Sequence, residues 1–394
     1  MGIRILTLNI QLTQINLIRQ KLNINRNYNK LYENKKTHYM KPFLVLILSA
    51  ILITGCTVNN EDKIDIIFKD YNRQDMPGAA VMVIDHSKIV FQKCYGLANV
   101  EQKKPVTDST NFRLASVTKQ FTAMCILMLI ERGQLKFETT LKDIFPEFPD
   151  YGKNITVKNL LQHTSGLIDY EDLISDTVTI QVKDKDVLNM MMKTDSTYFE
   201  TGSKHQYSNT GYALLAVTIE KISGKPFGEF LKENIFTPLE MNNTIAFENN
   251  INQVTNRAYG YTIKENKVQF TDQSITSAVL GDGGIYTSLS DLYKWDQSLY
   301  TEKLISKKYF DQSWTEGTTT DGNKFPYGYG WRLETYNSNK VVYHTGSTRG
   351  FRNIIYRIPE QKFTIVILTN RDAGSEFSTL EFAHKIVDIF AIHN

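Results

Sequence analysis

Apolar stretches of strand length lie near both ends of the chain, and apolar stretches of helix length lie between them. Residues 79–84 and 89–95 are apolar runs on either side of the polar residues 85–88, a pattern that predicts a β-hairpin. Toward the C-terminal end, three further segments are expected to be strands, at residues 341–344, 351–358 and 363–369, with a turn at residues 359–362. Helices are expected to flank these strands at residues 64–71 and 376–390.

The middle of the chain has the pattern of buried helices. The stretch from Phe121 to Ile130 is apolar on all sides and ends at Gly133, which predicts a buried helix with a glycine stop. A second apolar helix is expected from Gly211 to Gly224. Together these elements predict an α/β (α+β) fold, in which both ends of the chain form one antiparallel sheet flanked by helices. A mostly helical lobe, at roughly residues 116–295, would be inserted into it, with a cleft at the junction.

The N-terminal region has the pattern of an export signal. Residues 42–53 form an apolar run of about a dozen residues, shorter than the roughly twenty that cross a membrane. The run follows Lys41 and ends in Ile-Thr-Gly-Cys56, which looks like a bacterial lipobox. The alternative is a short buried helix. We therefore expect an upstream extension at 1–39, a lipoprotein signal peptide at 40–55, a lipidated tether at 56–63 and one globular domain at 64–394.

Composition limits the classes of partner. Residues 1–55 hold eight Lys or Arg and one Glu, a net charge of +7 that leaves −4 for the rest of a chain of total charge +3. This balance gives no support for nucleic-acid binding. Cys56 is assigned to the lipid, and whether Cys94 and Cys125 form a disulfide is left open. No Cys/His cluster has metal spacing, so neither metal nor cofactor is expected.

One serine has a lysine three residues later. If Ser116 opens the helix that contains Phe121, Ser116 and Lys119 lie on one helix face, and the amine can approach the hydroxyl. A serine hydroxyl is a poor nucleophile at neutral pH and needs such a base. A Ser-x-x-Lys pair alone is a weak signal, since a solvated helix start has the same sequence.

Two further motifs follow in order, Tyr207-Ser208-Asn209 before an apolar helix and His344-Thr345-Gly346 at the end of a strand. Together the three motifs resemble the penicillin-recognising serine hydrolases, in the branch of class C β-lactamases, D-alanyl-D-alanine carboxypeptidases, D-aminopeptidases and related esterases. The resemblance covers nearly all of the globular domain and implies the β-lactamase/transpeptidase-like fold. Other stretches typical of this branch are found at residues 160–167, 235–239, 283–287, 291–292 and 327–331.

The resemblance implies a role for each motif residue. Ser116 would attack a carbonyl carbon, Lys119 would take or relay its proton, and Tyr207 would serve the leaving group and later the hydrolytic water. Asn209 would hold the substrate amide. The oxyanion would lie between the backbone N–H groups of Ser116 and Ser347, and one such donor contributes roughly 3 kcal/mol.

His344 departs from the pattern of the β-lactamases in this branch, which carry a lysine there. A histidine of unperturbed pKa about 6.5 is mostly neutral near pH 7 and is a weaker anchor for a substrate carboxylate. Gly346 would let a ligand approach the strand. Arg349 and Arg352 are candidates for restoring an anion site, with solvated strand surface as the default. His163 is expected to hydrogen-bond a turn.

Three functions remain open from the sequence. The first is a lipid-anchored serine hydrolase of the bacterial cell envelope, acting on peptides, amides or esters, with D-amino-acid peptides as the favoured class. The second is a class C-like β-lactamase. The third is a catalytically idle lipoprotein that binds or senses wall fragments. The intact set of Ser116, Lys119 and Tyr207 argues against the third, and His344 argues against the second.

Overall fold

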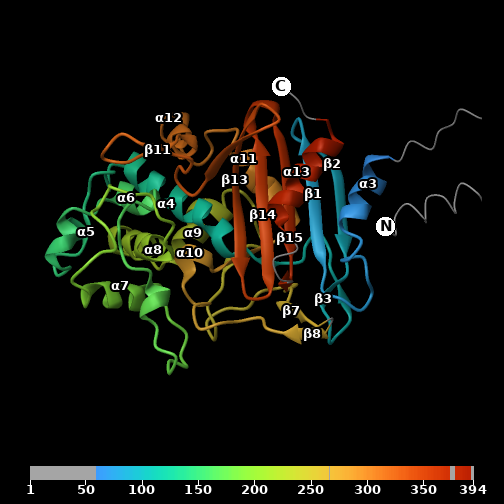
Figure 1. Cartoon of the computed structure of the whole chain (residues 1–394), viewed down its shortest axis with the longest axis horizontal. Helices are drawn as coiled ribbons and strands as arrows, with labels where there is room; N and C mark the ends of the chain where they lie inside the picture. Colours follow the sequence, from blue (N-terminus) through green and yellow to red (C-terminus); the bar gives the residue numbers. More distant parts are fainter. Residues whose placement is uncertain (1–58, 266, 373–377, 392–394) are drawn as a thin grey trace, which may run out of the picture. The chain divides into compact units, whose positions relative to one another are not determined.

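A six-stranded antiparallel sheet carries the fold, and both ends of the chain contribute to it (Figure 1). The strand order is β12-β13-β14-β15-β1-β2. The strands are β1 (Ala79–Asp85), β2 (Lys88–Tyr95), β12 (Arg332–Tyr336), β13 (Asn339–Thr348), β14 (Phe351–Ile358) and β15 (Phe363–Thr369). Strand β1 pairs with β15, with Ala79 opposite Thr369 and Ile84 opposite Thr364. The expected sheet of two chain ends is therefore confirmed.

This computed structural model describes residues 59–265, 267–372 and 378–391. The expected signal peptide, the lipidation site Cys56 and the start of the tether lie outside the described residues. Within the described part, no helix is long and apolar enough to cross a membrane. Cys94 and Cys125 are both unpaired.

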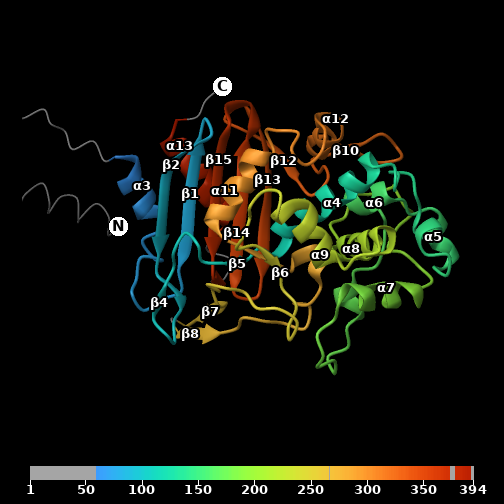
Figure 2. The ribbon, with the colours of Figure 1, turned by 180° about the vertical axis from the view of Figure 1, so that it is seen from behind.

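Alternate side chains of β1 point into two different hydrophobic cores, one on each face of the sheet. Ala79, Val81 and Val83 face the core under α3 (Asn60–Ile67) and α13 (Thr379–Ile389), which lie over one face of the sheet (Figure 1). The residues between them face the opposite core, where α11 (Leu289–Ser298) packs on the sheet (Figure 2). Because both faces are covered, β1 and β15 are buried along almost their whole length and consist mainly of apolar residues.

The start of α3 and the presence of β12 differ from the sequence-based expectation. Helix α3 begins at Asn60, four residues before the expected start, because the side chain of Asn59 accepts a hydrogen bond from Asp62 N and caps the helix. Strand β12 was not expected. Its sequence mixes charged, polar and aromatic residues, as befits an edge strand that has only one neighbour.

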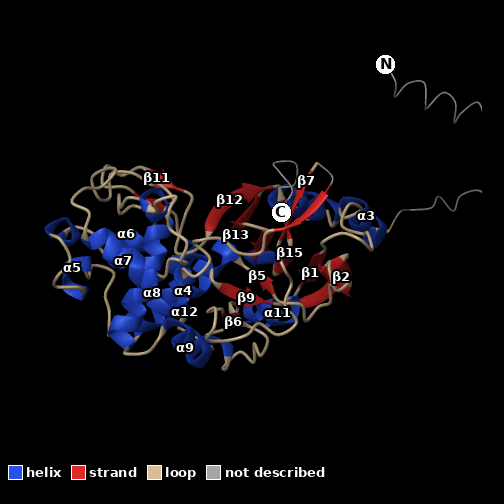
Figure 3. Ribbon diagram, turned by 90° about the horizontal axis from the view of Figure 1, so that it is seen from below, coloured by secondary structure: helices blue, strands red, loops and turns tan. Residues whose placement is uncertain are grey.

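The helical lobe lies beside the sheet and is centred on α4 (Lys119–Glu131) and α8 (Asn209–Ser223) (Figure 3). Both correspond to the expected apolar helices. Twelve of the thirteen residues of α4 are buried, as its all-round apolar pattern requires. The other helices are α5 (Leu141–Ile144), α6 (Val157–Leu161), α7 (Asp184–Met192), α9 (Phe227–Leu231), α10 (Leu280–Gly283) and α12 (Lys307–Phe310).

Short strands form four further small sheets. One joins β5 (Phe112–Arg113), β9 (Ile285–Thr287) and β6 (Ile245–Ala246), and another joins β16 (Arg371–Asp372), β7 (Tyr261–Lys264) and β8 (Lys267–Phe270). Two pairs complete them, β3 (Leu97–Asn99) with β4 (Lys104–Pro105) and β10 (Gly317–Thr318) with β11 (Lys324–Phe325). Strand β5 leads directly into the segment that carries Ser116.

Candidate active site

Ser116 lies in a 3₁₀ turn, η1 (Ala115–Thr118), and the α-helix itself begins at Lys119. The expectation that Ser116 opens the α-helix is therefore corrected, although the i and i+3 side chains still meet. Lys119 Nζ lies 3.1 Å from Ser116 Oγ. Ala115, just before the serine, has a φ of 50°, a strained value for a residue with a side chain. Such strain is typical of turns that present a functional group.

Lys119 makes three hydrogen bonds, which is the full capacity of an ammonium group. Nζ donates to Ser116 Oγ, to Asn209 Oδ1 at 2.9 Å and to the backbone oxygen of Asp282 at 3.0 Å. The residue is fully buried. An ammonium group cannot accept a proton, so the neutral amine is the form that can activate Ser116. The geometry thus brings together the predicted site residues Ser116, Lys119 and Asn209. Lys119 lies on α4 and Asn209 on α8.

Tyr207 lies just before α8, with its ring between two cations. The ring centroid is 5.0 Å from Lys119 Nζ and 5.1 Å from Arg332 Cζ. Its hydroxyl oxygen is buried and has no hydrogen-bond partner among the described residues. An unpartnered buried hydroxyl is costly in a folded protein. The Tyr207 hydroxyl is therefore available for a hydrogen bond to another molecule.

His344 is buried and neutral. Its Nε2 lies 3.1 Å from Tyr327 Oη, and its Nδ1 lies 2.7 Å from the backbone oxygen of Thr345. Burial, reinforced by the charges of Arg332 and Lys119, holds the pKa of His344 well below its usual value. The neutral tautomer that fits both contacts donates from Nδ1 and accepts at Nε2 from the tyrosine. His344 therefore supplies no positive charge to the site.

Gly346 lets β13 approach the nucleophile turn. A Cβ at this position would lie 2.0 Å from the backbone oxygen of Leu114, two residues before Ser116. The approach places Ser347, the next residue on β13, on the wall of the same cavity as Ser116. This cavity has a volume of about 40 Å³. The two backbone N–H groups expected to bind the oxyanion thus belong to residues that line one small site.

The two arginine candidates for an anion site differ in their contacts. Arg352 forms an ion pair with Asp372 and donates from Nη1 to the backbone oxygens of Thr348 and Phe351, at 2.6 and 2.8 Å. Its guanidinium therefore holds the turn between β13 and β14. Arg349 is exposed, lies within that turn and is not among the residues that line the cavity. Neither arginine faces Ser116 in the way that a carboxylate anchor requires.

His163 makes a structural contact. Its Nδ1 accepts a hydrogen bond of 3.2 Å from Ser208 N, just before α8. Burial, followed by the charge of Lys119, keeps its pKa well below the usual value. This geometry agrees with the expectation that His163 hydrogen-bonds a turn. The contact fixes the backbone between the two site residues Tyr207 and Asn209.

Sequence reasoning missed several residues of the site. Arg332 lies against Tyr207, while Glu171, Asp282 and Arg113 line the cavity with Ser116. A signal was present for two of them. Arg332 directly follows the stretch at residues 327–331, and Asp282 directly precedes the stretch at residues 283–287, both already typical of the branch. Glu171 carried no such signal, because it lies in a segment without clear periodicity.

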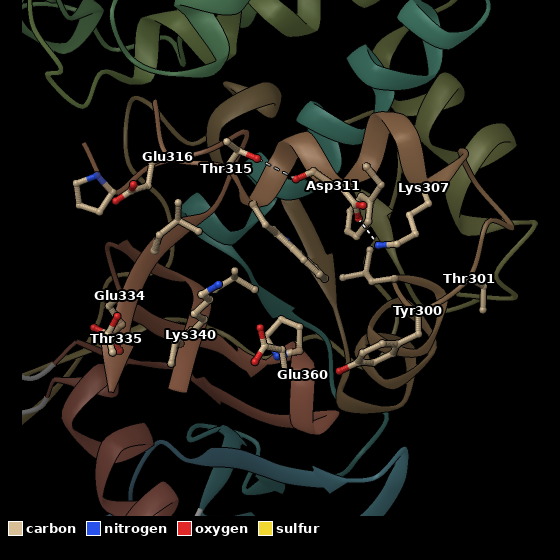
Figure 4. Close-up of a pocket in the computed structure, with 18 of the residues that line it drawn as sticks. Tyr300, Thr301, Lys307, Asp311, Thr315, Glu316, Glu334, Thr335, Lys340 and Glu360 are labelled. Atoms are coloured by element: carbon tan, nitrogen blue, oxygen red, sulfur yellow. Dashed lines mark hydrogen bonds and ion pairs between the residues drawn. The ribbon is translucent and has the colours of Figure 1, made fainter. Parts of the chain in front are cut away.

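A larger cavity of about 1090 Å³ lies away from these residues (Figure 4). Its wall combines α12, the following turn and the strands β12 and β13, and an ion pair between Lys307 and Asp311 crosses one side. None of the predicted catalytic residues lines it. We assign the chemistry to the small cavity, because only there do a nucleophile, a base and a glycine-bearing strand meet.

Comparisons with known proteins agree with this geometry. The family model described as Beta-lactamase matches residues 64–387. A penicillin-binding protein of Bacillus subtilis is 30% identical over 335 residues, which are 81% of this chain and 74% of that protein. Protein flp of Staphylococcus aureus strain MRSA252 is 28% identical over 84% of this chain, and the match spans 66% of the relative's length.

Solved structures of the same fold include one from Pyrococcus abyssi and one from Ochrobactrum anthropi. An octameric penicillin-binding protein homologue from Pyrococcus abyssi matches with a TM-score of 0.73 and 26% identity, over 85% of this chain and 78% of that one. A D-amino acid amidase from Ochrobactrum anthropi, in complex with L-phenylalanine amide, matches with a TM-score of 0.72 and 23% identity, over 84% and 98%. The second likeness concerns the fold alone. With its family model matched from the first helix to the last, the chain belongs to the β-lactamase family of serine hydrolases.

Proposed function

We propose that this protein is a serine hydrolase of the bacterial cell envelope that forms an acyl-enzyme on Ser116. Its substrates would be peptides, amides or esters, with D-amino-acid peptides favoured. The observation that carries the proposal is the hydrogen bond of 3.1 Å between Lys119 Nζ and Ser116 Oγ, beside a cavity that Ser347 also lines. A nucleophile, its base and an oxyanion-side strand are the parts that acyl transfer needs.

The steps follow from the positions of these groups. The neutral amine of Lys119 takes the proton of Ser116, and Oγ bonds to the substrate carbonyl carbon. The negative oxygen is then stabilised by the backbone N–H groups of Ser116 and Ser347. Tyr207 donates its proton to the leaving group as the bond to the carbonyl carbon breaks. In the second half, the Tyr207 phenolate takes a proton from water, whose oxygen bonds to the acyl carbon. The bond between that carbon and Ser116 Oγ then breaks, and the Lys119 ammonium returns its proton to Oγ, so that all three residues regain their starting protonation states.

The envelope location rests on the relatives and on the N-terminal sequence. The matched proteins of Bacillus subtilis and Staphylococcus aureus are a penicillin-binding protein and protein flp, both from bacteria. The lipobox-like sequence before Cys56 supports attachment through a lipid. Replacement of Cys56 by Ser should move the protein from the membrane fraction to the soluble fraction, and an unchanged distribution would count against the anchor.

Labelling by a fluorophosphonate probe tests the proposed chemistry. The wild-type protein should be labelled and Ser116→Ala should not, because Oγ is the atom that the probe modifies. A p-nitrophenyl ester and nitrocefin, assayed side by side, then separate a general hydrolase from a β-lactamase. We expect the ester to be the better substrate, since the buried neutral His344 offers no charge to a β-lactam carboxylate. Equal labelling of both proteins would refute a catalytic role for Ser116.

A further inference from the structure

Lys119 must present its lone pair to Ser116 if it is to act as the base. The neutral amine has two N–H groups and one lone pair. When the two N–H groups donate to Asn209 Oδ1 at 2.9 Å and to the backbone oxygen of Asp282 at 3.0 Å, the lone pair is left to face Ser116 Oγ. If either acceptor moves away, the amine can rotate and turn an N–H group toward the serine instead. The Asp282 oxygen therefore helps to set the direction of the base.

The Asp282 oxygen belongs to α10, a helix of only four residues. The first four N–H groups of a helix have no partner within it, so contacts with other segments must set the position of α10. Thr122 Oγ1 on α4 donates to Gly281 O at 2.7 Å. Arg113 Nε donates to Gly283 O at 3.2 Å. Both contacts bind carbonyl groups and leave the N–H groups of α10 to another partner.

A carboxyl group from a distant segment binds the first two of these N–H groups. Asp184 is the first residue of α7 and precedes Leu280 by 96 residues. Its Oδ2 accepts from Leu280 N at 2.8 Å, and its Oδ1 accepts from Gly281 N at 2.9 Å. The Asp184 side chain is buried, and it does not line the cavity with Ser116. A planar carboxyl group bound to two successive N–H groups fixes both the position and the direction of the start of α10.

The two hydrogen bonds do not depend on the charge of Asp184. Burial raises the pKa of this carboxyl group to about 8, and the two N–H groups of α10 oppose the shift. The oxygen that carries the proton in the acid form keeps acceptor capacity, so both oxygens can accept in either form. An asparagine side chain has one acceptor oxygen and one NH₂ donor. Replacement of Asp184 by Asn therefore removes one of the two acceptors at any pH.

We propose that Asp184 is a positioning residue for the base Lys119. By binding the first two N–H groups of α10, its carboxyl group holds the backbone oxygen of Asp282 at the place from which that oxygen orients the amine toward Ser116. This inference rests on the proposed function, because it concerns the base of the same reaction. Asp184 touches no substrate and acts only through α10.

Asp184→Asn tests the role without a change in side-chain size. The new NH₂ group would face an N–H group of α10, and two donors that face each other form no hydrogen bond, so the start of α10 should shift. We expect kcat for p-nitrophenyl acetate and the rate of fluorophosphonate labelling to fall about tenfold or more, while KM changes less than about twofold, because no contact with substrate is lost. An unchanged kcat, or a loss confined to KM, would overturn the proposal.

Asp186→Asn is the matched control. Asp186 lies in the same first turn of α7, is exposed, and accepts a hydrogen bond of 3.0 Å from Lys183 N rather than from α10. The substitution makes the same chemical change and keeps an acceptor for Lys183 N. We expect kcat to stay within about twofold of the wild-type value. Equal losses in the two variants would show that a weakened α7, and not the bond to α10, lowers the rate.

Thr122→Val tests the same helix from the opposite side, and it decides the question if Asp184→Asn does not fold. It removes the hydrogen bond to Gly281 O, so kcat should again fall while KM stays nearly constant. Because both substitutions release the same helix, the double variant should lose less activity than the product of the two single losses. An unchanged kcat for Thr122→Val, or losses that multiply, would overturn the proposal.

The failure of this inference differs from the failure of the proposed function. Labelling of the wild-type protein, and its absence in Ser116→Ala, test the chemistry at Ser116 and do not involve Asp184. A wild-type protein that is labelled at Ser116, with an Asp184→Asn variant that is as fast, would overturn the positioning role alone. A wild-type protein without Ser116-dependent labelling would overturn both.

Discussion

At the scale of single residues, one of the two cations beside the Tyr207 ring is an arginine that the three motifs do not contain. Arg332 Cζ lies 5.1 Å from the ring centroid of Tyr207 and 5.9 Å from that of Tyr327. Among the described residues it forms no ion pair, and its Nε is buried without a partner. His344, where β-lactamases of this branch have lysine, is neutral. We infer that Arg332 provides the permanent cation that His344 does not.

Arg332→Gln should lower kcat for a p-nitrophenyl ester about tenfold and change KM little. The physical reason is that a cation beside the ring stabilises the phenolate that forms as Tyr207 gives up its proton, an effect of about 1–2 kcal/mol. Arg332→Lys keeps the charge and should retain most of the activity. An effect confined to KM, or a lysine variant as slow as the glutamine variant, would show that Arg332 acts through packing instead.

At the scale of elements, the catalytic turn is held by two register partners of the sheet. Gly346 on β13 lies opposite Asn353 on β14. Asn353 Nδ2 donates to the backbone oxygens of Arg113 and Leu114, at 2.8 and 3.3 Å, while Gly346 leaves room for Leu114 to approach. Asn353 thus binds the segment before Ser116, and Gly346 permits the close contact with that segment. The strand pair therefore positions the oxyanion-side backbone against the nucleophile turn.

Gly346→Ala should lower kcat by about 10²-fold or more. The new Cβ would lie 2.0 Å from Leu114 O, so β13 would have to move away from the turn and the Ser347 N–H would leave the oxyanion position. Ester hydrolysis and the rate of fluorophosphonate labelling measure the loss. Gly228→Ala is the matched control, because its Cβ would meet only Ala246 Cβ at 3.4 Å. Equal activity of the two variants would contradict the close approach.

The elements also show what local pattern can and cannot predict. The sequence patterns correctly predicted β1, β2, β14 and β15. Strands β1 and β15 are buried along almost their whole length and are mainly apolar, whereas the edge strand β2 is largely exposed and was recognised from its place in a hairpin. Strand β13 was expected only at residues 341–344, although it spans Asn339–Thr348. Its second half is mostly polar and contains Gly346, and glycine is depleted in strands. That half is held by pairing with β14, a contact that no local pattern records.

At the scale of the whole described unit, the junction of sheet and lobe contains three histidines, His163, His205 and His344. Each pKa lies below its usual value, chiefly because of burial, and that of His205 falls to about 4. The ring of His205 stacks on Phe325 with centroids 4.4 Å apart. Protonation would place additional charge beside Lys119 and Arg332. The sheet and the lobe therefore pack together with these three histidines in their neutral form.

His205 should make the protein less stable as the pH falls from about 6.5 to about 4. The unfolded state binds the proton near pH 6.5, while the folded state resists it until about pH 4, so the contribution of His205 is fully present above pH 6.5 and is lost below it. His205→Gln cannot titrate, so its deficit in unfolding free energy should shrink as the pH falls through this range. Urea unfolding at several pH values measures the difference.

The exposed His86 in the turn between β1 and β2 provides the comparison for this experiment. His86→Gln makes the same substitution outside the junction. A pH-independent difference between wild type and His205→Gln would mean that His205 titrates alike in the folded and unfolded states.

The sequence by itself determined the family, the sheet built from both chain ends and the two apolar helices of the lobe. These follow from local periodicity and from short motifs, whose information is carried by neighbouring residues. Only the tertiary structure decided which charges surround those motifs. Glu171 meets Asn209, and Arg332 meets Tyr207, across segments that share no local pattern. Such contacts depend on how whole elements pack, and they set which charged groups surround the motif residues.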